Sequence, residues 1–398
     1  MRRFTEALGH PQRKFPSIHV AGTNGKGSVC AMLEALYRGN GYKTGLYTSP
    51  HLVHLGERVQ VNREMLSDQA IIDMIQRLKP IAETISAGEP DEHPSFFEFM
   101  TAAAFLRFAE AEVDLALIET GLGGRLDATN VLDPELSIIT SISLDHTELL
   151  GDAIDKIARE KGGIIKPGKP VLIGKLADEA EKAIRQIADE HGSKVFSIRE
   201  RFAKPDELPE TNLAGSFQRW NAGVALYASE ILSKQFPISK HDGLQNIDWA
   251  GRWQRIETKD RTLILDATHN PEGAEMLEEN LQKLIGEIGQ KPVIVAGTLG
   301  KDRGRSLMEV AGRYANEIHL LAPAQDRALS TDNLAELIPQ KFQGPVFKDT
   351  IERLFSAPYR CTVGSPGDTI VVTGSLYLIG EVLQHLQGIP DSDLQDKI

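Results

Sequence analysis

Short apolar runs alternate along most of the chain with segments whose apolar residues recur every three or four positions. The run 115–119 predicts a buried strand because its side chains are apolar on both faces until the last residue, and the segment from Ile18 predicts a short apolar strand. The segment after Ser28 instead predicts a helix, since its apolar residues share one face: Val29, Met32, Leu33, Leu36 and Tyr37. This alternation is typical of an α/β fold with a mostly parallel sheet covered by helices on both sides.

The pattern occurs twice, on either side of a polar, irregular stretch at 239–253. Before this stretch it predicts strands at 44–48, 115–119, 136–140 and 171–173 and helices at 97–109, 177–191 and 218–232. After it come predicted strands at 262–266, 293–295, 318–321 and 369–372 and helices at 271–285 and 305–316. We therefore predict two domains, a larger one over 1–247 and a smaller Rossmann-like α/β domain over 248–398.

The composition narrows the class of protein. Of 398 residues, 41% are hydrophobic and 25% charged, as in a globular enzyme. The formal net charge of −12 argues against nucleic acid as a partner, because binding phosphates over a large surface needs a basic face. Cys30 and Cys361 are too few for a disulfide framework or a zinc site, so we expect a cytoplasmic protein. No signal core and no bilayer-spanning apolar run is found, so no membrane partner is expected.

The segment 18–28 joins an apolar strand, a glycine-rich turn and the start of a helix. Backbone N–H groups of such a turn point at an anion, and Lys26 adds a positive charge. The larger domain is therefore predicted to be a P-loop domain that binds a nucleotide triphosphate. The loop departs from the common pattern at Gly27, because Ser or Thr usually follows the lysine there. In this chain the hydroxyl side chain comes one residue later, at Ser28. A plain strand–turn–helix connection is the alternative, but it gives the lysine little purpose.

Polar residues follow three of the predicted strands. Ser49, Glu119 and His146 all come at or just after carboxyl ends of strands, where functional residues gather in open α/β sheets. Hydroxyl, carboxylate and imidazole could together hold Mg²⁺, although histidine is an unusual ligand for so hard a cation. Taken singly, each has a structural alternative: Ser49 as a turn cap, Glu119 as a partner of Arg125, and His146 as a helix cap.

Further candidates come from later segments. The glycine-rich run 121–127 follows Glu119 and allows its backbone to approach a ligand closely; a flexible loop is the alternative. Arg252 follows the predicted boundary, and the strand end at Asp266 is followed by His269. An arginine and an Asp/His pair at a domain junction suit phosphate and ribose contacts across a cleft.

Several motifs together form a known pattern. They are GTNGKGS (22–28), SPHL (49–52), ETGLGGRLDATN (119–130), LDHT (144–147), EKGGI (160–164), Gly251-Arg252, DATHNP (266–271) and GSLYL (374–378). In this order, over nearly the whole chain, they closely resemble the folylpolyglutamate synthase and dihydrofolate synthase family of Mur ligases. The run 119–130 is the most specific piece.

The resemblance implies an ATP-dependent ligase that adds L-glutamate to folates, and to dihydropteroate, through an acyl phosphate. It assigns Lys26, Lys161 and His146 to catalysis, with Lys161 as a carbamylated lysine. It assigns ATP contacts to Gly22, Thr23, Asn24, Gly25, Lys26, Gly27, Ser28, Asn221, Arg252, Asp266 and His269. It assigns two magnesium ions to the site, with Ser49, Glu119 and His146 as ligands. It places the pterin near Thr48, Phe97, Arg125, Leu126 and Asp127.

Some features depart from the family pattern or leave alternatives open. The chain starts almost at the piece Leu8-Gly9-His10-Pro11-Gln12, where the family usually has a longer preceding segment, so the dihydropteroate activity is less secure than the folate activity. The alternatives are another Mur-type amide ligase, such as one for peptidoglycan precursors, and a regulatory P-loop ATPase. The run 125–127 and the lack of a UDP-sugar domain argue against the first. We expect a monomer.

Overall fold

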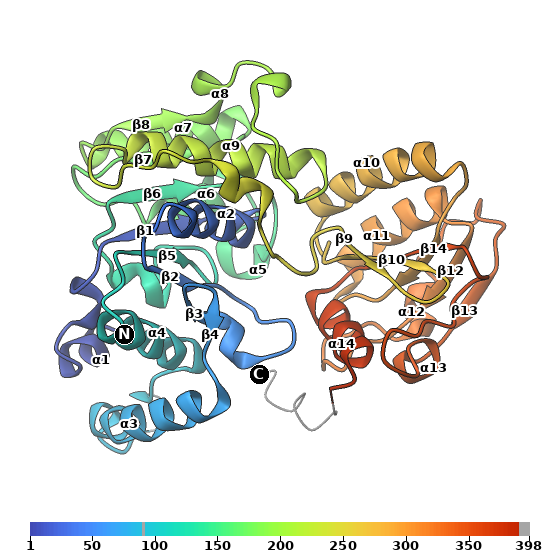
Figure 1. Cartoon of the computed structure of the whole chain (residues 1–398), viewed down its shortest axis with the longest axis horizontal. Helices are drawn as coiled ribbons and strands as arrows, with labels where there is room; N and C mark the ends of the chain where they lie inside the picture. Colours follow the sequence, from blue (N-terminus) through green and yellow to red (C-terminus); the bar gives the residue numbers. More distant parts are fainter. Residues whose placement is uncertain (90–91, 390–398) are drawn as a thin grey trace.

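The computed structural model describes residues 1–89 and 92–389 and shows two α/β units side by side (Figure 1). The first unit is built on a sheet in the order β4-β3-β2-β5-β1-β6-β7-β8. Neighbouring strands are parallel from β2 through to β8, whereas the pairs β2–β3 and β3–β4 are antiparallel. Its strands are β1 (Ser17–Ala21), β2 (Thr44–Tyr47), β3 (Val59–Val61), β4 (Glu64–Met65), β5 (Leu115–Glu119), β6 (Leu136–Ile139), β7 (Val171–Ile173) and β8 (Val195–Ser197).

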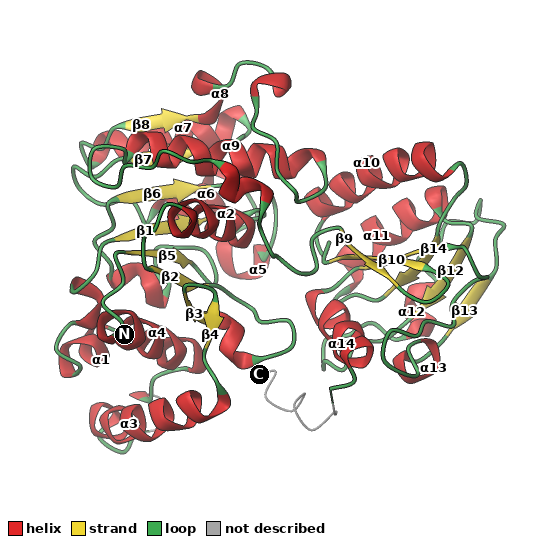
Figure 2. Cartoon of the chain, viewed as in Figure 1, coloured by secondary structure: helices red, strands yellow, loops and turns green. Residues whose placement is uncertain are grey.

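Helices cover both faces of this sheet (Figure 2). The helices of the first unit are α1 (Arg2–Ala7), α2 (Lys26–Gly39), α3 (Asp68–Ser86), α4 (Phe96–Glu110), α5 (Thr147–Leu150), α6 (Ile154–Gly162), α7 (Asp178–Glu190), α8 (Ile198–Arg201) and α9 (Ser216–Ile231). Helices α2 and α9 pack on one face, and α4, α6 and α7 pack on the other. Short 3₁₀ helices lie at Pro11–Arg13, Leu55–Arg58, Ala128–Val131, Pro205–Glu207 and Asp242–Gln245.

The second unit has a smaller sheet in the order β13-β12-β11-β14-β10-β9, antiparallel only between β10 and β9. Its strands are β9 (Gln254–Glu257), β10 (Thr262–Asp266), β11 (Val293–Ala296), β12 (Glu317–Leu320), β13 (Val346–Lys348) and β14 (Thr369–Thr373). Its helices are α10 (Pro271–Ile288), α11 (Lys301–Tyr314), α12 (Thr331–Ala335), α13 (Ile351–Leu354) and α14 (Leu376–Gln387). Helices α10 and α11 cover one face, and α13 and α14 the other.

The predicted α/β fold class, with a larger mostly parallel sheet and a smaller one, is confirmed. The predicted strands at 115–119, 171–173 and 262–266 have the same bounds in the structure. The helix predicted at 305–316 instead spans Lys301–Tyr314, because its first turn is polar and carries no apolar signal. The predicted division at 247/248 falls between the last 3₁₀ helix and β9, and it stays a prediction.

Candidate active site

The phosphate-binding loop follows β1 directly, and α2 begins at Lys26. Gly25 caps α2 with a φ of +85°, a left-handed conformation that glycine adopts without strain. A Cβ on Gly25 would lie 2.6 Å from Asn221 Oδ1, so the amide on α9 packs against the turn. The loop thus presents the N–H groups of a helix start at the edge of the sheet, an arrangement that suits an anion.

Glu119 ends β5 beside this loop. Lys26 Nζ lies 3.9 Å from Glu119 Oε1, and the Ser49 N–H donates a hydrogen bond to Glu119 Oε2 at 3.1 Å. Burial raises the pKa of Glu119, and Lys26 offsets only part of that increase. Arg125, the alternative partner, pairs instead with Glu160 at 2.9 Å. A buried carboxylate next to a serine therefore supplies oxygen atoms of the kind that Mg²⁺ prefers.

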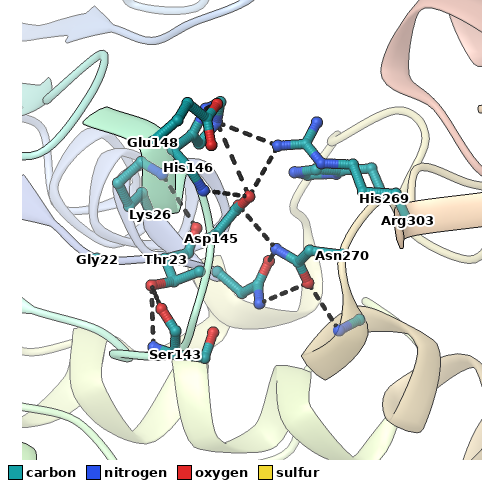
Figure 3. A network of polar contacts seen from close by, with 12 residues as sticks. Gly22, Thr23, Lys26, Ser143, Asp145, His146, Glu148, His269, Asn270 and Arg303 are labelled. Atoms are coloured by element: carbon teal, nitrogen blue, oxygen red, sulfur yellow. Dashed lines mark hydrogen bonds and ion pairs between the residues drawn. The ribbon is translucent and has the colours of Figure 1, made fainter. Parts of the chain in front are cut away.

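His146 lies at the start of α5 in a polar network that joins the two units (Figure 3). Arg303, on α11, donates from Nη2 to Asp145 Oδ1 at 2.7 Å and approaches His146 Nε2 to 3.4 Å. Burial lowers the pKa of His146, and Asp145 opposes the shift only in part. The imidazole is therefore neutral at pH 7 and keeps one nitrogen lone pair for a ligand.

Two carboxylates tie the units together at the loop. Glu272, in the first turn of α10, accepts hydrogen bonds from Asn24 Nδ2 at 2.6 Å and Ser143 Oγ at 2.8 Å. Asp145, in the first unit, accepts hydrogen bonds from two donors of the second unit, Asn270 Nδ2 at 3.1 Å and Arg303 Nη2 at 2.7 Å. Each unit thus contributes a carboxylate that is held by donors of the other.

Lys161, near the end of α6, is buried at the loop, with 4% of its surface exposed. Its Nζ donates a hydrogen bond to the carbonyl oxygen of Gly22 at 2.8 Å. Burial, helped by the charge of Lys26, lowers the pKa of Lys161 to about 7. A large share of this amine is therefore neutral at pH 7, and only the neutral form is a nucleophile.

The second unit contributes Arg252, Asp266 and His269. Burial raises the pKa of Asp266 and lowers that of Arg252, and the opposite charges of the pair act against both shifts. The Asp266 carboxylate accepts from the Trp253 N–H at 3.2 Å, which fixes the end of β10. Burial lowers the pKa of His269 to about 4, so its ring is neutral, with Nδ1 2.8 Å from the Ala267 carbonyl oxygen.

A cavity of about 250 Å³ lies between the two units and brings most of the predicted residues together. The predicted residues that line it are Gly22, Thr23, Asn24, Gly25, Lys26, Gly27, Ser28, Ser49, Glu119, His146, Lys161, Arg252, Asp266 and His269. Asn221 does not line this cavity but packs against the loop at Gly25. A single cavity is therefore lined by the phosphate loop of the first unit and by Arg252, Asp266 and His269 of the second.

The predicted acceptor residues lie around a second, more open cavity of about 1010 Å³. It is lined by Phe97, Arg125, Leu126 and Asp127. The Asp127 carboxylate faces the protein, where Oδ2 accepts from the Gly121 N–H at 2.8 Å and Oδ1 from the Thr129 N–H at 2.9 Å. Asp127 therefore shapes the glycine-rich loop of this cavity.

Thr48 is set apart from the other predicted acceptor residues. It lines a third cavity of about 240 Å³, between the β3–β4 hairpin and the segment that joins the units. Ser49 and Pro50 line all three cavities, so the spaces meet at this turn.

Sequence reasoning missed four residues of the site: Asp145, Arg303, Asn270 and Glu272. Asp145 precedes His146 after β6, so its place at the strand end was a usable signal. Arg303 gave none, because a single arginine in the first turn of a helix normally reaches solvent. Among residues 1–89 and 92–389, no three His, Cys, Asp or Glu side chains gather as a metal site, and the predicted metal set includes a serine.

Comparisons with known proteins give the family. The profile of the Mur ligase middle domain matches residues 20–222, and that of the Mur ligase glutamate ligase domain matches 251–376. A dihydrofolate synthase/folylpolyglutamate synthase from Bacillus subtilis is 33% identical over 97% of this chain and 94% of its own length. The chain belongs to the folylpolyglutamate synthase family of Mur ligases.

Solved structures of this Mur ligase family share the fold of the whole chain. A folylpolyglutamate synthase from Thermotoga maritima is 31% identical, with a TM-score of 0.82 over 99% of this chain and 95% of its own. A bifunctional folylpolyglutamate synthase/dihydrofolate synthase solved with Mn, AMPPNP and L-glutamate has a TM-score of 0.81 and 29% identity over 97% and 93% of the two chains.

These matches confirm the family and the ligase class predicted from the sequence, and they do not favour the regulatory ATPase or the peptidoglycan-type ligase. The roles of single residues in this Mur ligase stay predictions. Within the part of the chain that the structure describes, no helix is both long and apolar enough to cross a bilayer.

Proposed function

We propose that this Mur ligase uses ATP and a divalent metal ion to join L-glutamate to folates, and that it also accepts dihydropteroate. The observation that carries the proposal is the junction itself. The phosphate loop with Lys26 faces Arg252 and Asp266 across one cavity, and a larger acceptor cavity meets that space at Ser49. The B. subtilis relative bears the names of both activities.

The chemistry proceeds in two steps. A carboxylate oxygen of the acceptor attacks the γ-phosphorus of ATP, and the bond to the β–γ bridging oxygen breaks, which gives an acyl phosphate and ADP. The glutamate amine then attacks the acyl carbon, inorganic phosphate leaves, and the amine loses a proton as the amide forms. Both steps depend on holding the reactants in line and on neutralising developing negative charge.

Residues of this chain perform that work at stated atoms. Lys26 Nζ lies where it can follow the charge of the γ-phosphoryl group, and the N–H groups at the start of α2 hold the other phosphate oxygens. Arg252 and Asp266 suit the phosphates and ribose from the opposite side of the cavity. The contacts of Glu272 and Asp145 keep both sides close, which limits access of water to the acyl phosphate.

The residues present fit a divalent ion. Glu119 is buried at the mouth of the loop and Lys26, at 3.9 Å, offsets its buried charge only in part. Ser49, Glu119 and His146 would hold the ion, and Mg²⁺ bound there would neutralise phosphate charge. A second ion would need another anionic ligand, which a carbamate on Lys161 would supply.

Phe97 and its neighbours suit a flat aromatic acceptor. Phe97 packs against Tyr47 with ring centroids 6.0 Å apart and lies against Gly121, where a Cβ would approach its ring to 2.5 Å. The side chains of Leu122 and Leu126 are exposed at the rim of the same cavity. This apolar surface, unusual beside so many polar groups, favours a pterin ring over a sugar. We further propose a monomeric, cytoplasmic enzyme.

The direct test measures ADP release by the full chain with Mg-ATP, tetrahydrofolate and L-glutamate, omitting each in turn. We expect release only when both cosubstrates are present, with a product one glutamate heavier than the acceptor by mass spectrometry. Dihydropteroate in place of tetrahydrofolate tests the second acceptor. ADP release that persists without glutamate or without acceptor would show that the chain is not this ligase.

Replacing Phe97 tests the position of the acceptor. We expect Phe97→Ala to raise the KM for tetrahydrofolate about tenfold, because a stacked aromatic contact and its buried area are lost. The KM for ATP should stay the same, since Phe97 does not line the nucleotide cavity. Phe99→Ala is the matched control, because Phe99 also packs against an aromatic ring, that of Phe4 at 6.0 Å, but lines none of the three cavities. Equal increases in both KM values would contradict the assignment.

A further inference from the structure

The segment that joins the two units packs against the phosphate loop through one tryptophan. A Cβ on Gly27 would lie 2.8 Å from Trp249 Cζ2 and 3.4 Å from Glu119 Oε2. The indole therefore occupies the space into which a side chain at position 27 would project. This contact gives a physical reason for the glycine at Gly27, where a common phosphate loop has Ser or Thr.

Arg63 lies over the ring of the same indole. Its guanidinium carbon lies 5.7 Å from the centroid of the Trp249 ring, and its Nη2 donates a hydrogen bond to the Asp248 carbonyl oxygen. Arg63 lies in the turn between β3 and β4 with a φ of +69°, and its Nε is 4.0 Å from the fully buried Glu34 on α2. The joining segment therefore packs between the phosphate loop and the β3–β4 turn.

Arg252 follows Trp249 by three residues and reaches the nucleotide cavity. Between them, the Gly251 carbonyl oxygen accepts from the Ala267 N–H at 2.9 Å, and the Gly251 N–H donates to Gln254 Oε1 at 3.0 Å. The chain from Trp249 to Arg252 is therefore fixed at both ends, by the loop of the first unit and by the β10 end of the second. Because only two residues separate Trp249 from Arg252, a displacement of the indole is expected to move the Arg252 side chain as well.

We propose that Trp249 is a positioning residue that holds segment 248–252 on the phosphate loop and thereby sets the place of Arg252 in the nucleotide cavity. The inference rests on the proposed function, because it takes Arg252 to contact the nucleotide. We also expect a nucleotide bound in the phosphate loop to affect the segment that joins the units, through the contact of Gly27 with the indole.

The kinetic test is a double-mutant cycle on the full chain. We expect Trp249→Leu to lower kcat/KM for ATP about 30-fold, the size of effect that a misplaced binding group produces. Trp249→Phe should recover most of the loss, since a flat ring still fits against Gly27. In Arg252→Ala, adding Trp249→Leu should cost less than about twofold more, because the indole acts through Arg252. Losses that multiply would overturn the proposal.

A matched control and a fluorescence signal separate this role from general packing. Trp220→Leu also removes a half-buried indole with a cation–π partner, Lys175 at 5.2 Å, and we expect it to leave kcat/KM for ATP unchanged. With Trp220 and Trp253 replaced by Phe, Trp249 is the chain's remaining tryptophan, and its emission should change when Mg-ADP saturates the loop.

The outcomes also distinguish the two proposals. If the wild-type chain binds ADP but forms no glutamylated product, the proposed function fails while the fluorescence test of Trp249 stands. If ADP binds and the emission of Trp249 stays constant, the positioning role is wrong even in an active ligase. Circular dichroism melting of each variant confirms that it is folded before its kinetics are compared.

Discussion

Lys26→Ala is expected to reduce ligase turnover by at least about 10³-fold, because the developing charge on the transferred phosphoryl group loses the cation of the phosphate loop. The same change leaves the buried Glu119 without the ammonium at 3.9 Å, so the pKa of that carboxyl should rise further above its ordinary value. The measurement is ADP release with both cosubstrates at saturating Mg-ATP, in parallel with the binding of Mg-ADP.

The control for Lys26→Ala is Lys169→Ala. Lys169 also pairs with a glutamate, Glu135 at 3.0 Å, but it lies away from all three cavities. It should keep wild-type turnover, with a small loss of stability of about 1 kcal/mol at most for a partly buried surface pair. Wild-type turnover in Lys26→Ala itself would remove the assignment of 22–28 as the phosphate loop, and with it the proposed mechanism.

Lys161→Ala is expected to lower turnover about 10²-fold and to regain part of it when acetate or propionate is added. The reason is that a small carboxylic acid can enter the space of a lost carbamate and restore its negative charge. Steady-state kinetics with and without the acid measure this rescue. Lys161→Met fills the space with an apolar chain and should not be rescued. A Lys161→Ala variant that is as slow with the acids as without them would contradict the carbamate.

The pH dependence of wild-type activation gives an independent check. The pKa of Lys161 is lowered to about 7, so its amine is mostly protonated below that pH and mostly neutral above it. Only the neutral Nζ adds to CO₂, which forms a carbamate and releases a proton. After CO₂ is removed, its return should therefore restore activity faster at about pH 8 than at about pH 6. Mass spectrometry of the intact chain should show the added mass under CO₂.

Predictability differed among elements for identifiable reasons. Strands β5, β7 and β10 were predicted with their observed bounds because they are buried on both faces and read as continuous apolar runs. Helix α3 was missed because its buried side chains form a narrow stripe, Met74, Leu78 and Ala82, and Pro80 interrupts it. The edge strands β4 and β13 were missed since all their side chains are exposed.

Candidate residues in the nucleotide site were found where a local motif carried them. The turn 22–28 and the strand ends at Glu119 and Asp266 depend on residues close in sequence, so spacing alone points to them. Arg303 could not be found in this way, since its role depends on meeting Asp145, which is 158 positions away. The packing of Trp249 on Gly27 was equally invisible, although the glycine itself was noticed as a departure.

By itself, then, the sequence determined the alternation of strands and helices, the phosphate loop and the family motifs, because each depends on side chains within a few positions of one another. Only the tertiary structure decided which units face each other across the cavity, which carboxylates bridge them, and how far burial moves the pKa of Lys161. The physical reason is that burial and charge are set by neighbours in space. Segments far apart in sequence supply those neighbours only once both sheets have formed and packed together.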